Sequence, residues 1–148
     1  LSDWRVDGAF VGLHADYLAR RYWQSHVSVS FPRLRPAAGG FQPQCPVNDA
    51  HMVQLMCALR LWLPDAGLVL STREPASLRE NLLPLGITQM SAGSKTAPGG
   101  YAAKENLEGQ FEISDLRSPQ EIVRMIAAHG YEPVWKDWDG AFLQNKIV

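Results

Sequence analysis

Apolar residues recur along the chain with two different periods, and these periods predict helices and strands in turn. One helix is expected over about residues 4 to 23 and a second over about residues 50 to 63, because apolar side chains recur at helical spacing in both. The apolar positions of the first are Phe10, Leu13, Tyr17 and Leu18. Those of the second are Met52, Leu55, Met56, Leu59 and Leu63. Both patterns are typical of amphipathic helices.

Three short stretches, at residues 27–33, 68–74 and 87–94, begin with apolar residues or an apolar–polar alternation, run into polar residues, and are predicted to contain strands. Short runs bounded by turn signals suit strands that are buried on both faces, as in parallel sheets. A further helix is expected after Pro75, and it should stop near Pro84 and Gly86.

A last helix is predicted to begin at Ser118, because Ser118 and Glu121 form a capping-box pattern with a proline between them. Gly130 should end this helix. Residues 93 to about 116 lack periodicity and are expected to be a loop. Trp135 and Trp138 indicate a packed tail over residues 132–139.

The resulting order is α-β-α-β-α-β-α, which predicts an α/β fold with right-handed crossovers and a parallel sheet. Three strands are few for such a sheet, because both faces need cover and both edges would be open. The chain is therefore expected to be part of a larger sheet or barrel. It begins with a leucine already close to a helix, which also suggests a piece of a longer protein.

Side-chain alternation along the three strands predicts a polar inner face. If Leu68 and Leu70 face the helices, then Val69, Ser71 and Arg73 face the other side. The same parity leaves Ser28 and Ser30 opposite the helices on the first strand, and Gln89 and Ser91 on the third. Polar side chains on a shared interior fit a ligand-filled barrel better than a dry core.

Arg73 is the strongest candidate binding group, because it lies where a strand ends and a helix begins, the edge at which α/β folds bind ligands. Its guanidinium could hold a carboxylate through a two-pronged fork, or form a salt bridge with Glu74, Glu80 or a neighbour. Arg33 and Arg35 lie in a proline-flanked loop, where they could bind an anion or face water.

Other chemical groups give weaker signals. Residues 91–96 only superficially resemble a phosphate-binding loop. His14 and His129 fall in helical patterns, and Asp137 and Asp139 flank a tryptophan without metal-ligand spacing. Cys57 falls in an apolar helical pattern, where a buried small hydrophobe is expected. With Cys45 it forms no CxxC or CxxxC pair, so a metal or cluster site built from this chain alone is not expected.

Composition narrows the class of protein. The 148 residues include 46% hydrophobic and 20% charged residues, which is the range of an ordinary globular domain. A formal net charge of −1 gives no electrostatic reason to expect nucleic acid or an acidic membrane as partner. The sequence has no apolar run of membrane-spanning length and no signal peptide, so a cytoplasmic location is expected.

Five short strings occur in an order and at intervals that resemble a known family. They are SFPRLRP at residues 30–36, LSTRE at 70–74, SAGSKT at 91–96, PGGY at 98–101 and PVWKDWD at 133–139. Together they resemble the C-terminal part of 2-iminoacetate synthases, the radical S-adenosylmethionine (SAM) tyrosine lyases of thiamine biosynthesis, from about Asp7 onward. The hydrogenase-maturation tyrosine lyase is similar over the same strings. It carries a C-terminal cysteine motif that residues 142–148 lack, which favours the thiamine enzymes.

The resemblance implies that residues 1–148 are the C-terminal part of a radical SAM (β/α)₈ barrel, the biotin and thiamin synthesis associated region. Its parent enzyme would use SAM and a [4Fe–4S] cluster to cleave the Cα–Cβ bond of L-tyrosine, giving 2-iminoacetate (dehydroglycine) and p-cresol. The cluster cysteines are absent from this chain. Partners implied are L-tyrosine, the N-terminal half of the barrel and, as a candidate, the thiazole synthase.

The resemblance assigns Arg73 to the carboxylate of tyrosine and Ser91 and Ser94 to hydrogen bonds nearby. Ser71, Arg33 and Arg35 complete the candidate substrate-binding set, and no catalytic residue or metal ligand is assigned. The isolated chain is then expected to be inactive, because the chemistry belongs to a cofactor it does not bind. The alternative is a stand-alone α/β binding or assembly module whose strand edges pair with another chain, and self-association through those edges is expected in either case.

Overall fold

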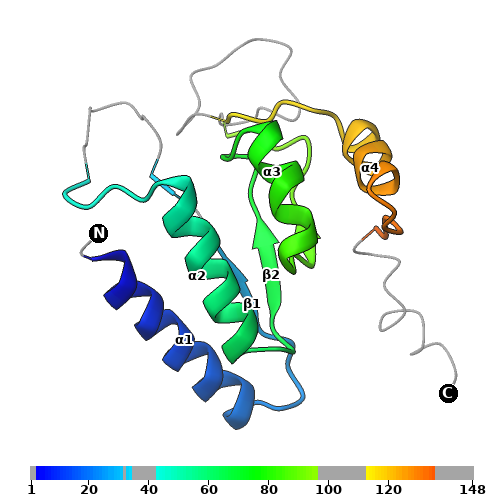
Figure 1. Cartoon of the computed structure of the whole chain (residues 1–148). Helices are drawn as coiled ribbons and strands as arrows, with labels where there is room; N and C mark the ends of the chain where they lie inside the picture. The colour runs from blue at the N-terminus through cyan, green and yellow to red at the C-terminus, as the bar shows by residue number, and fades with distance from the viewer. Residues whose placement is uncertain (1–2, 32, 35–42, 97–112, 136–148) are drawn as a thin grey trace, which may run out of the picture.

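The computed structural model describes residues 3–31, 33–34, 43–96 and 113–135, and they form three parallel strands with helices between them (Figure 1). Two of the helices are α1 (Trp4–Arg21) and α2 (Asp49–Trp62). The others are α3 (Ala76–Leu82), the 3₁₀ turn η1 (Leu83–Leu85) and α4 (Pro119–Ala128). The strands are β1 (Ser28–Ser30), β2 (Gly67–Leu70) and β3 (Gln89–Met90). The predicted α/β fold and its element order are confirmed.

The sheet has the order β1-β2-β3, with both pairs parallel, so each crossover between neighbouring strands contains a helix. Its register aligns Ser30, Val69 and Gln89 in one row across the sheet. Ser28, Ser30 and Gln89 are exposed, whereas Val29, Leu68 and Leu70 on the alternate positions are buried. The predicted alternation of polar and apolar faces is therefore confirmed for the strands.

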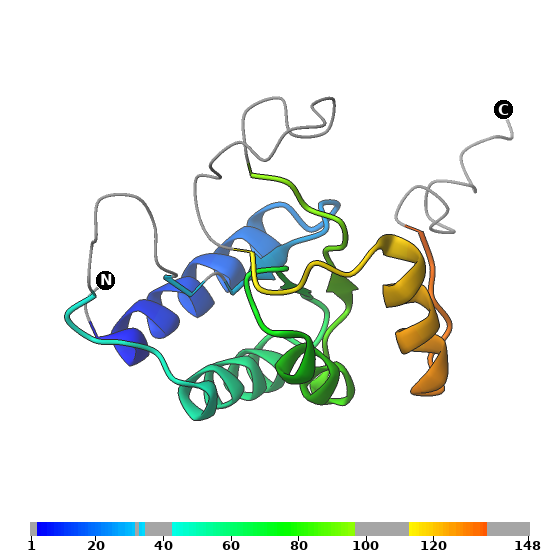
Figure 2. The same cartoon turned by 90° about the horizontal axis from the view of Figure 1, so that it is seen from above.

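The core lies between the apolar face of the sheet and the helices α1, α2 and α3. Met52, Met56 and Leu59 of α2 are almost fully buried against this face, and Leu82 of α3 joins them. Seen from above, the helices form an arc around the strands and leave the other face of the sheet without a helix from the described residues (Figure 2). A second, smaller cluster joins Leu83 to Ile122 and Met125 of α4.

Helix α1 packs through a different face from the one its apolar pattern suggested. Its buried residues are Gly8, Gly12 and Ala15, whereas Phe10, Leu13 and Tyr17 are 55–68% exposed. A Cβ on Gly8 would meet Leu55 Cδ1 at 2.4 Å, and one on Gly12 would meet the Trp62 ring at 2.3 Å. The two helices therefore approach closely over small residues, and the apolar stripe of α1 faces away from the core.

The helix ends follow the local sequence closely. Ser118 and Glu121 form the predicted capping box of α4, and Gly130 adopts a positive φ of 82° just after that helix. Asp3 and Asn48 cap α1 and α2 by accepting hydrogen bonds from Arg5 N and His51 N at 2.8 Å. These side chains satisfy backbone donors that a helix leaves unpaired in its first turn.

Some expectations are corrected or remain open. Trp135 is 53% exposed rather than packed, and Cys57 is only half-buried. Trp138, Asp137, Asp139 and the string at residues 98–101 lie outside the described residues. No helix in the described ranges has the length and apolar character needed to cross a membrane.

Candidate functional site

The predicted site residues gather at the carboxyl ends of β2 and β3. Ser71 and Arg73 follow β2 directly, and Ser91 and Ser94 follow β3, so all four lie at one edge of the parallel sheet. All four are half-buried. Ser91 N donates to the carbonyl of Leu70 at 3.0 Å, which holds the ends of the two strands together. Ser71 Oγ accepts a hydrogen bond from Arg73 N at 3.2 Å, which shapes the turn that presents Arg73.

A cavity of about 470 Å³ opens beside this edge, and Arg73 lines it together with Ser30 and Arg33. The rest of the wall comes from the amino-terminal half of α1, one face of α2, residues 43–47 and the neighbours of Ser30 and Arg33 along the chain, and it is largely apolar. Ser71, Ser91 and Ser94 are not among its lining residues. The structure thus brings Arg73 together with the β1 side of the site, and the two serines after β3 lie apart from that cavity.

Arg33 is engaged with carboxylates. Its Nε donates to both carboxylate oxygens of Glu74 at 3.0 and 3.1 Å, Nη2 also contacts Glu74, and Nη1 donates to Asp49 Oδ1 at 2.7 Å. Hydrogen bonds to Glu74 raise the pKa of the Arg33 guanidinium despite its burial. Because Glu74 is fully buried, this pair ties the loop after β1 to the turn after β2. Arg35 lies outside the described residues, so its predicted role stays a prediction.

A second ionic cluster lies on the β3 side of the same turn, and sequence reasoning did not find it. Arg79 is fully buried and contacts Asp115 Oδ2 through Nη1 and the Ser91 carbonyl through Nη2. Asp115 also accepts from Arg117 N, Nε and Nη2 at 3.1, 2.9 and 2.7 Å. Arg117 in turn pairs with Glu80. The signal in the sequence that could have revealed this cluster is the arginine at position 79. It lies three and four positions before Leu82 and Leu83, and therefore on the same helical face as these apolar residues.

The electrostatics of this cluster reflect its burial. Burial by itself would raise the pKa of Asp115, but the hydrogen bonds from Arg117 and Arg79 outweigh it and lower that pKa from 3.8 to about 2. Burial lowers the pKa of the Arg79 guanidinium, and the bond to Asp115 opposes the shift. The hydrogen bond to Asp115 raises the pKa of Arg117. Asp115 is therefore charged at neutral pH and is held between two cations.

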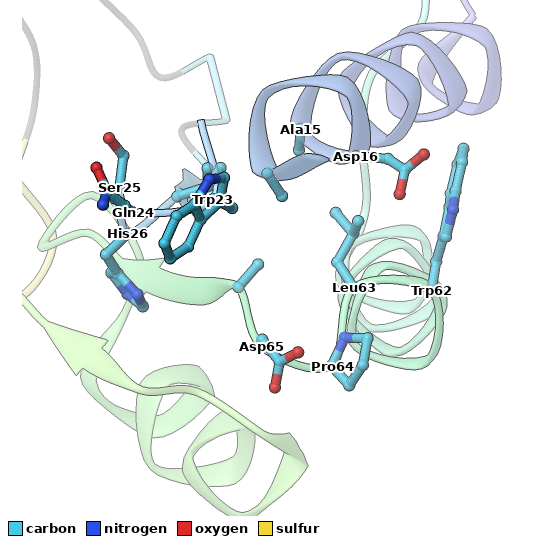
Figure 3. A pocket seen from close by; sticks show the side chains of 13 residues that line it. Ala15, Asp16, Trp23, Gln24, Ser25, His26, Trp62, Leu63, Pro64 and Asp65 are labelled. Atoms are coloured by element: carbon cyan, nitrogen blue, oxygen red, sulfur yellow. The ribbon is translucent and has the colours of Figure 1, made fainter. Parts of the chain in front are cut away.

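Another cavity of about 470 Å³ lies at the opposite edge of the sheet, before β1 and β2 (Figure 3). Trp23 and Trp62 stand on opposite sides of it, with Leu63 between them, and Asp16, His26 and Asp65 reach its wall (Figure 3). Asp16 is engaged by Arg20 Nε at 3.0 Å. None of the predicted site residues that the structure describes lines this cavity.

The residues described here do not fit a [4Fe–4S] cluster. Among them, no three His, Cys, Asp or Glu side chains are grouped as a metal site needs. Cys45 is exposed in the loop before α2 and Cys57 is half-buried on α2, and both are free thiols. Since such clusters are held by several cysteine thiolates, this part of the chain offers no cradle for one.

What the arrangement can do is bind an anion beside a polar strand edge. Arg73, whose guanidinium is an always-charged, forked donor, is one of the residues that line a largely apolar cavity, and this combination suits a carboxylate on an otherwise apolar ligand. The hydroxyls of Ser71, Ser91 and Ser94 are further donors and acceptors at the same edge of the sheet. No nucleophile–base pair is evident among the predicted site residues.

The sequence and the fold of this chain are both similar to those of known proteins. The chain is 48% identical over 140 residues to 2-iminoacetate synthase of Escherichia coli and 47% identical to that of Salmonella typhimurium. Each alignment covers 94% of this chain but 37% of the relative, so the chain spans little more than a third of the curated relatives' length.

Two solved structures are similar. The crystal structure of HydG, a maturase of the [FeFe]-hydrogenase, matches with a TM-score of 0.77 and 36% identity over 87% of this chain and 28% of that one. HydG from Carboxydothermus hydrogenoformans matches with a TM-score of 0.69 and 39% identity over 82% of this chain and 28% of that one. Residues 30–132 match the family described as the Biotin and Thiamin Synthesis associated domain. This chain belongs to the Biotin and Thiamin Synthesis associated domain family.

Proposed function

We propose that this chain is the C-terminal part of a radical SAM lyase that cleaves the Cα–Cβ bond of L-tyrosine. The products would be 2-iminoacetate and p-cresol, the former for the thiazole of thiamine. The observation that carries the proposal is 48% identity to 2-iminoacetate synthase over 94% of the chain. In this proposal the three strands are the last part of a (β/α)₈ barrel, and their polar face looks into its interior.

Arg73 is the proposed clamp for the substrate carboxylate. Its position supports this role, because it follows β2 at the carboxyl edge of the sheet and lines a largely apolar cavity. A fork of two N–H donors fixes both the position and the orientation of a carboxylate, and radical chemistry needs the amino acid held rigidly and away from water. Ser71, Ser91 and Ser94 lie at the same edge of the sheet without lining this cavity, and they are the proposed donors to polar groups of the amino acid that extend beyond it.

The role proposed for Arg33 differs from that of Arg73. Among the described residues, Arg33 donates to Glu74, Asp49 and the Val47 carbonyl, so its proposed support for substrate binding is indirect. By holding Glu74, it would fix the residue next to Arg73. Direct contact between Arg33 and the substrate stays a prediction.

The [4Fe–4S] cluster that such lyases use together with SAM would be held by cysteines that this chain does not contain. When bound, the cluster and SAM supply the radical that such lyases need, and this chain contributes binding and orientation of the amino acid. The chain alone should therefore release no p-cresol from tyrosine. Formation of p-cresol by this polypeptide alone, together with iron–sulfur absorbance, would contradict the proposal.

The direct test is Arg73→Ala in the complete protein that carries this chain. Removing one partner of a buried, hydrogen-bonded charge pair costs about 2–5 kcal/mol, so the KM for tyrosine should rise thirtyfold or more. Arg73→Lys keeps the charge but not the fork and should recover only part of the loss. Arg124→Ala, on the exposed face of α4, is the matched control. Unchanged KM and kcat in Arg73→Ala would refute the assignment.

The hydrogenase-maturation lyase is the second candidate, and the similarity to two HydG structures favours it. Both candidates would bind tyrosine through the same groups, so the reaction products separate them. Accumulation of 2-iminoacetate, or of the glyoxylate that its hydrolysis yields, identifies the thiamine enzyme.

A stand-alone assembly module is the third candidate. The exposed apolar stripe of α1, at Phe10, Leu13 and Tyr17, favours a partner on that face. Light scattering of the isolated chain tests this, because a monomer at high concentration would argue against self-association. A dimer that dissociates when the remaining barrel sequence is supplied would support the enzyme instead. The thiazole synthase as partner and a cytoplasmic location stay predictions.

A further inference from the structure

One buried network contacts the ends of both β2 and β3. Arg79 donates to the carbonyl of Ser91 just after β3 and to Asp115. The backbone N–H groups of Ser114 and Asp115 donate to the Thr72 carbonyl just after β2, at 3.1 and 3.0 Å. A single side chain and its carboxylate partner therefore connect the two strand tips from which Arg73 and Ser91 emerge.

The turn that carries Arg73 is held on both of its flanks. Thr72, on one side, is 2% exposed and accepts the two backbone hydrogen bonds from Ser114 and Asp115. Glu74, on the other side, is fully buried and bound by Arg33. The residues before and after Arg73 are thus fixed by two separate networks, while Arg73 itself reaches the cavity.

Stability alone is a poor explanation for the Arg79 network. Removing two charges from water is costly, and apolar side chains of similar volume often serve a core equally well or better. Here Arg79 Nε is also buried without a hydrogen-bond partner among the described residues, which adds to the cost. What an apolar pair would not supply is the directed hydrogen bond from Arg79 to the Ser91 carbonyl.

We propose that Arg79 is a positioning residue, which with Asp115 sets the spacing between the β2 tip bearing Arg73 and the β3 tip bearing Ser91. The inference rests on the proposed function, because it assigns Arg79 a purpose at that substrate site. Arg79 does not itself line the cavity. It acts through the backbone of Ser91 and, by way of Asp115, through that of Thr72.

The test separates positioning from folding with a double variant, Arg79→Met/Asp115→Leu. Replacing both partners by apolar side chains of similar size leaves no unpaired buried charge, so the fold should be kept. Arg117 retains Glu80 as a partner. Arg124→Met, an arginine replaced on the exposed face of α4, is the control. Arg79→Lys keeps the charge, but one ammonium cannot reproduce the fork that reaches both Asp115 and Ser91.

The first readout is amide hydrogen exchange in this chain, which needs no substrate. Exchange of the Ser91 and Ser114 amides should accelerate about tenfold in the double variant, because their local opening becomes easier. The Met52 and Leu63 amides, which report on α2, should be unchanged. Protection at Ser91 and Ser114 equal to that of the unsubstituted chain would overturn the inference.

The second readout is tyrosine turnover by the complete protein carrying the same substitutions. The KM for tyrosine should rise about tenfold in the double variant, Arg79→Lys should recover part of it, and Arg124→Met should behave as the unsubstituted protein does. A KM that is unchanged while Ser91 and Ser114 exchange faster would also overturn the inference. If the unsubstituted protein does not turn over tyrosine at all, the proposed function fails, and the exchange result still decides whether Arg79 holds the two strand tips.

Discussion

The two ends of the sheet are both held by arginines, but the partners of those arginines differ in charge. At the amino-terminal end, Arg60 donates to backbone carbonyls of Gly86, Leu63, Pro64 and Ala66, at 2.7 to 3.4 Å. At the carboxyl-terminal end, Arg33 and Arg79 bind the buried carboxylates of Glu74 and Asp115. One end is fixed by neutral acceptors and the other by buried ion pairs.

This difference shows at which end of the sheet the fold includes buried ion pairs, whose charges must be removed from water at a cost in free energy. Carbonyls at chain reversals need donors in any case, and a partly buried guanidinium satisfies several of them at once. Buried ion pairs are costly to assemble and very costly to break on one side, so they hold their elements in one arrangement. The costly type occurs at the edge that carries Arg73, which is the edge where a ligand would need rigid groups.

The largest effect should come from breaking the carboxyl-terminal end on one side only. Arg79→Met leaves Asp115, whose side chain is 1% exposed, with Arg117 as its remaining cationic partner among the described residues. We expect a loss of about 3 kcal/mol in the free energy of unfolding, the low end for a broken buried pair, because Arg117 still compensates part of the charge. Urea titration followed by circular dichroism measures it, and a loss below about 1 kcal/mol would mean that the pair is not coupled to the core.

Acid should weaken the same end of the sheet. The pKa of Asp115 is lowered from 3.8 to about 2 in the fold, so its contribution is complete above about pH 4 and disappears as the pH falls through about 2. A shift of this size corresponds to about 2 kcal/mol. Unfolding free energies measured between those pH values should fall more steeply for the unsubstituted chain than for Asp115→Asn. Parallel profiles for the two proteins would show that Asp115 titrates normally.

Breaking the amino-terminal end should cost less and should not depend on acid. Arg60→Met removes a donor from four carbonyls, of which the Pro64 contact is exposed and the other three are partly buried, and we expect a loss of about 1–2 kcal/mol. Because its partners are neutral, this loss should be the same at about pH 4 and at pH 7. A strong pH dependence of the Arg60→Met effect would remove the distinction between the two ends.

The smallest effect is expected away from both ends, on the apolar stripe of α1. Phe10→Gln changes a side chain that is 68% exposed, so the stability of the isolated chain should change by no more than about 0.5 kcal/mol. In the complete protein the same substitution should weaken folding or assembly if the stripe is covered there. Thermal melts of both forms make the comparison, and equal, negligible shifts in both would show that the stripe has no partner.

Much of the fold could be predicted from local signals. The helical stripe of α2, the capping box at Ser118 and the alternation on β1 and β2 were all visible in the sequence and are confirmed. These signals are local because caps, turns and strand parity depend on residues only a few positions apart. The position of Arg73 at a strand end followed from the same reasoning.

The sequence could not show which face of α1 is buried. Both its apolar stripe and its small-residue face have helical spacing, and the choice depends on how closely Leu55 and Trp62 of α2 approach. Nor could it show that Arg33 binds Glu74, 41 positions away, rather than a ligand or water. Pairings at such distances are decided only when the crossovers bring the strand ends together.

The sequence by itself therefore determined the order of elements, their caps, the polar face of the sheet and the place of Arg73 at its edge. Only the tertiary structure decided that Arg79 is buried, that it joins Asp115, 36 positions away, and that both networks flank the Arg73 turn. The physical reason is that a lone arginine on a short helix looks like a surface residue until its neighbours exclude water. Its partner is then fixed by the geometry of the surrounding chain and not by sequence spacing.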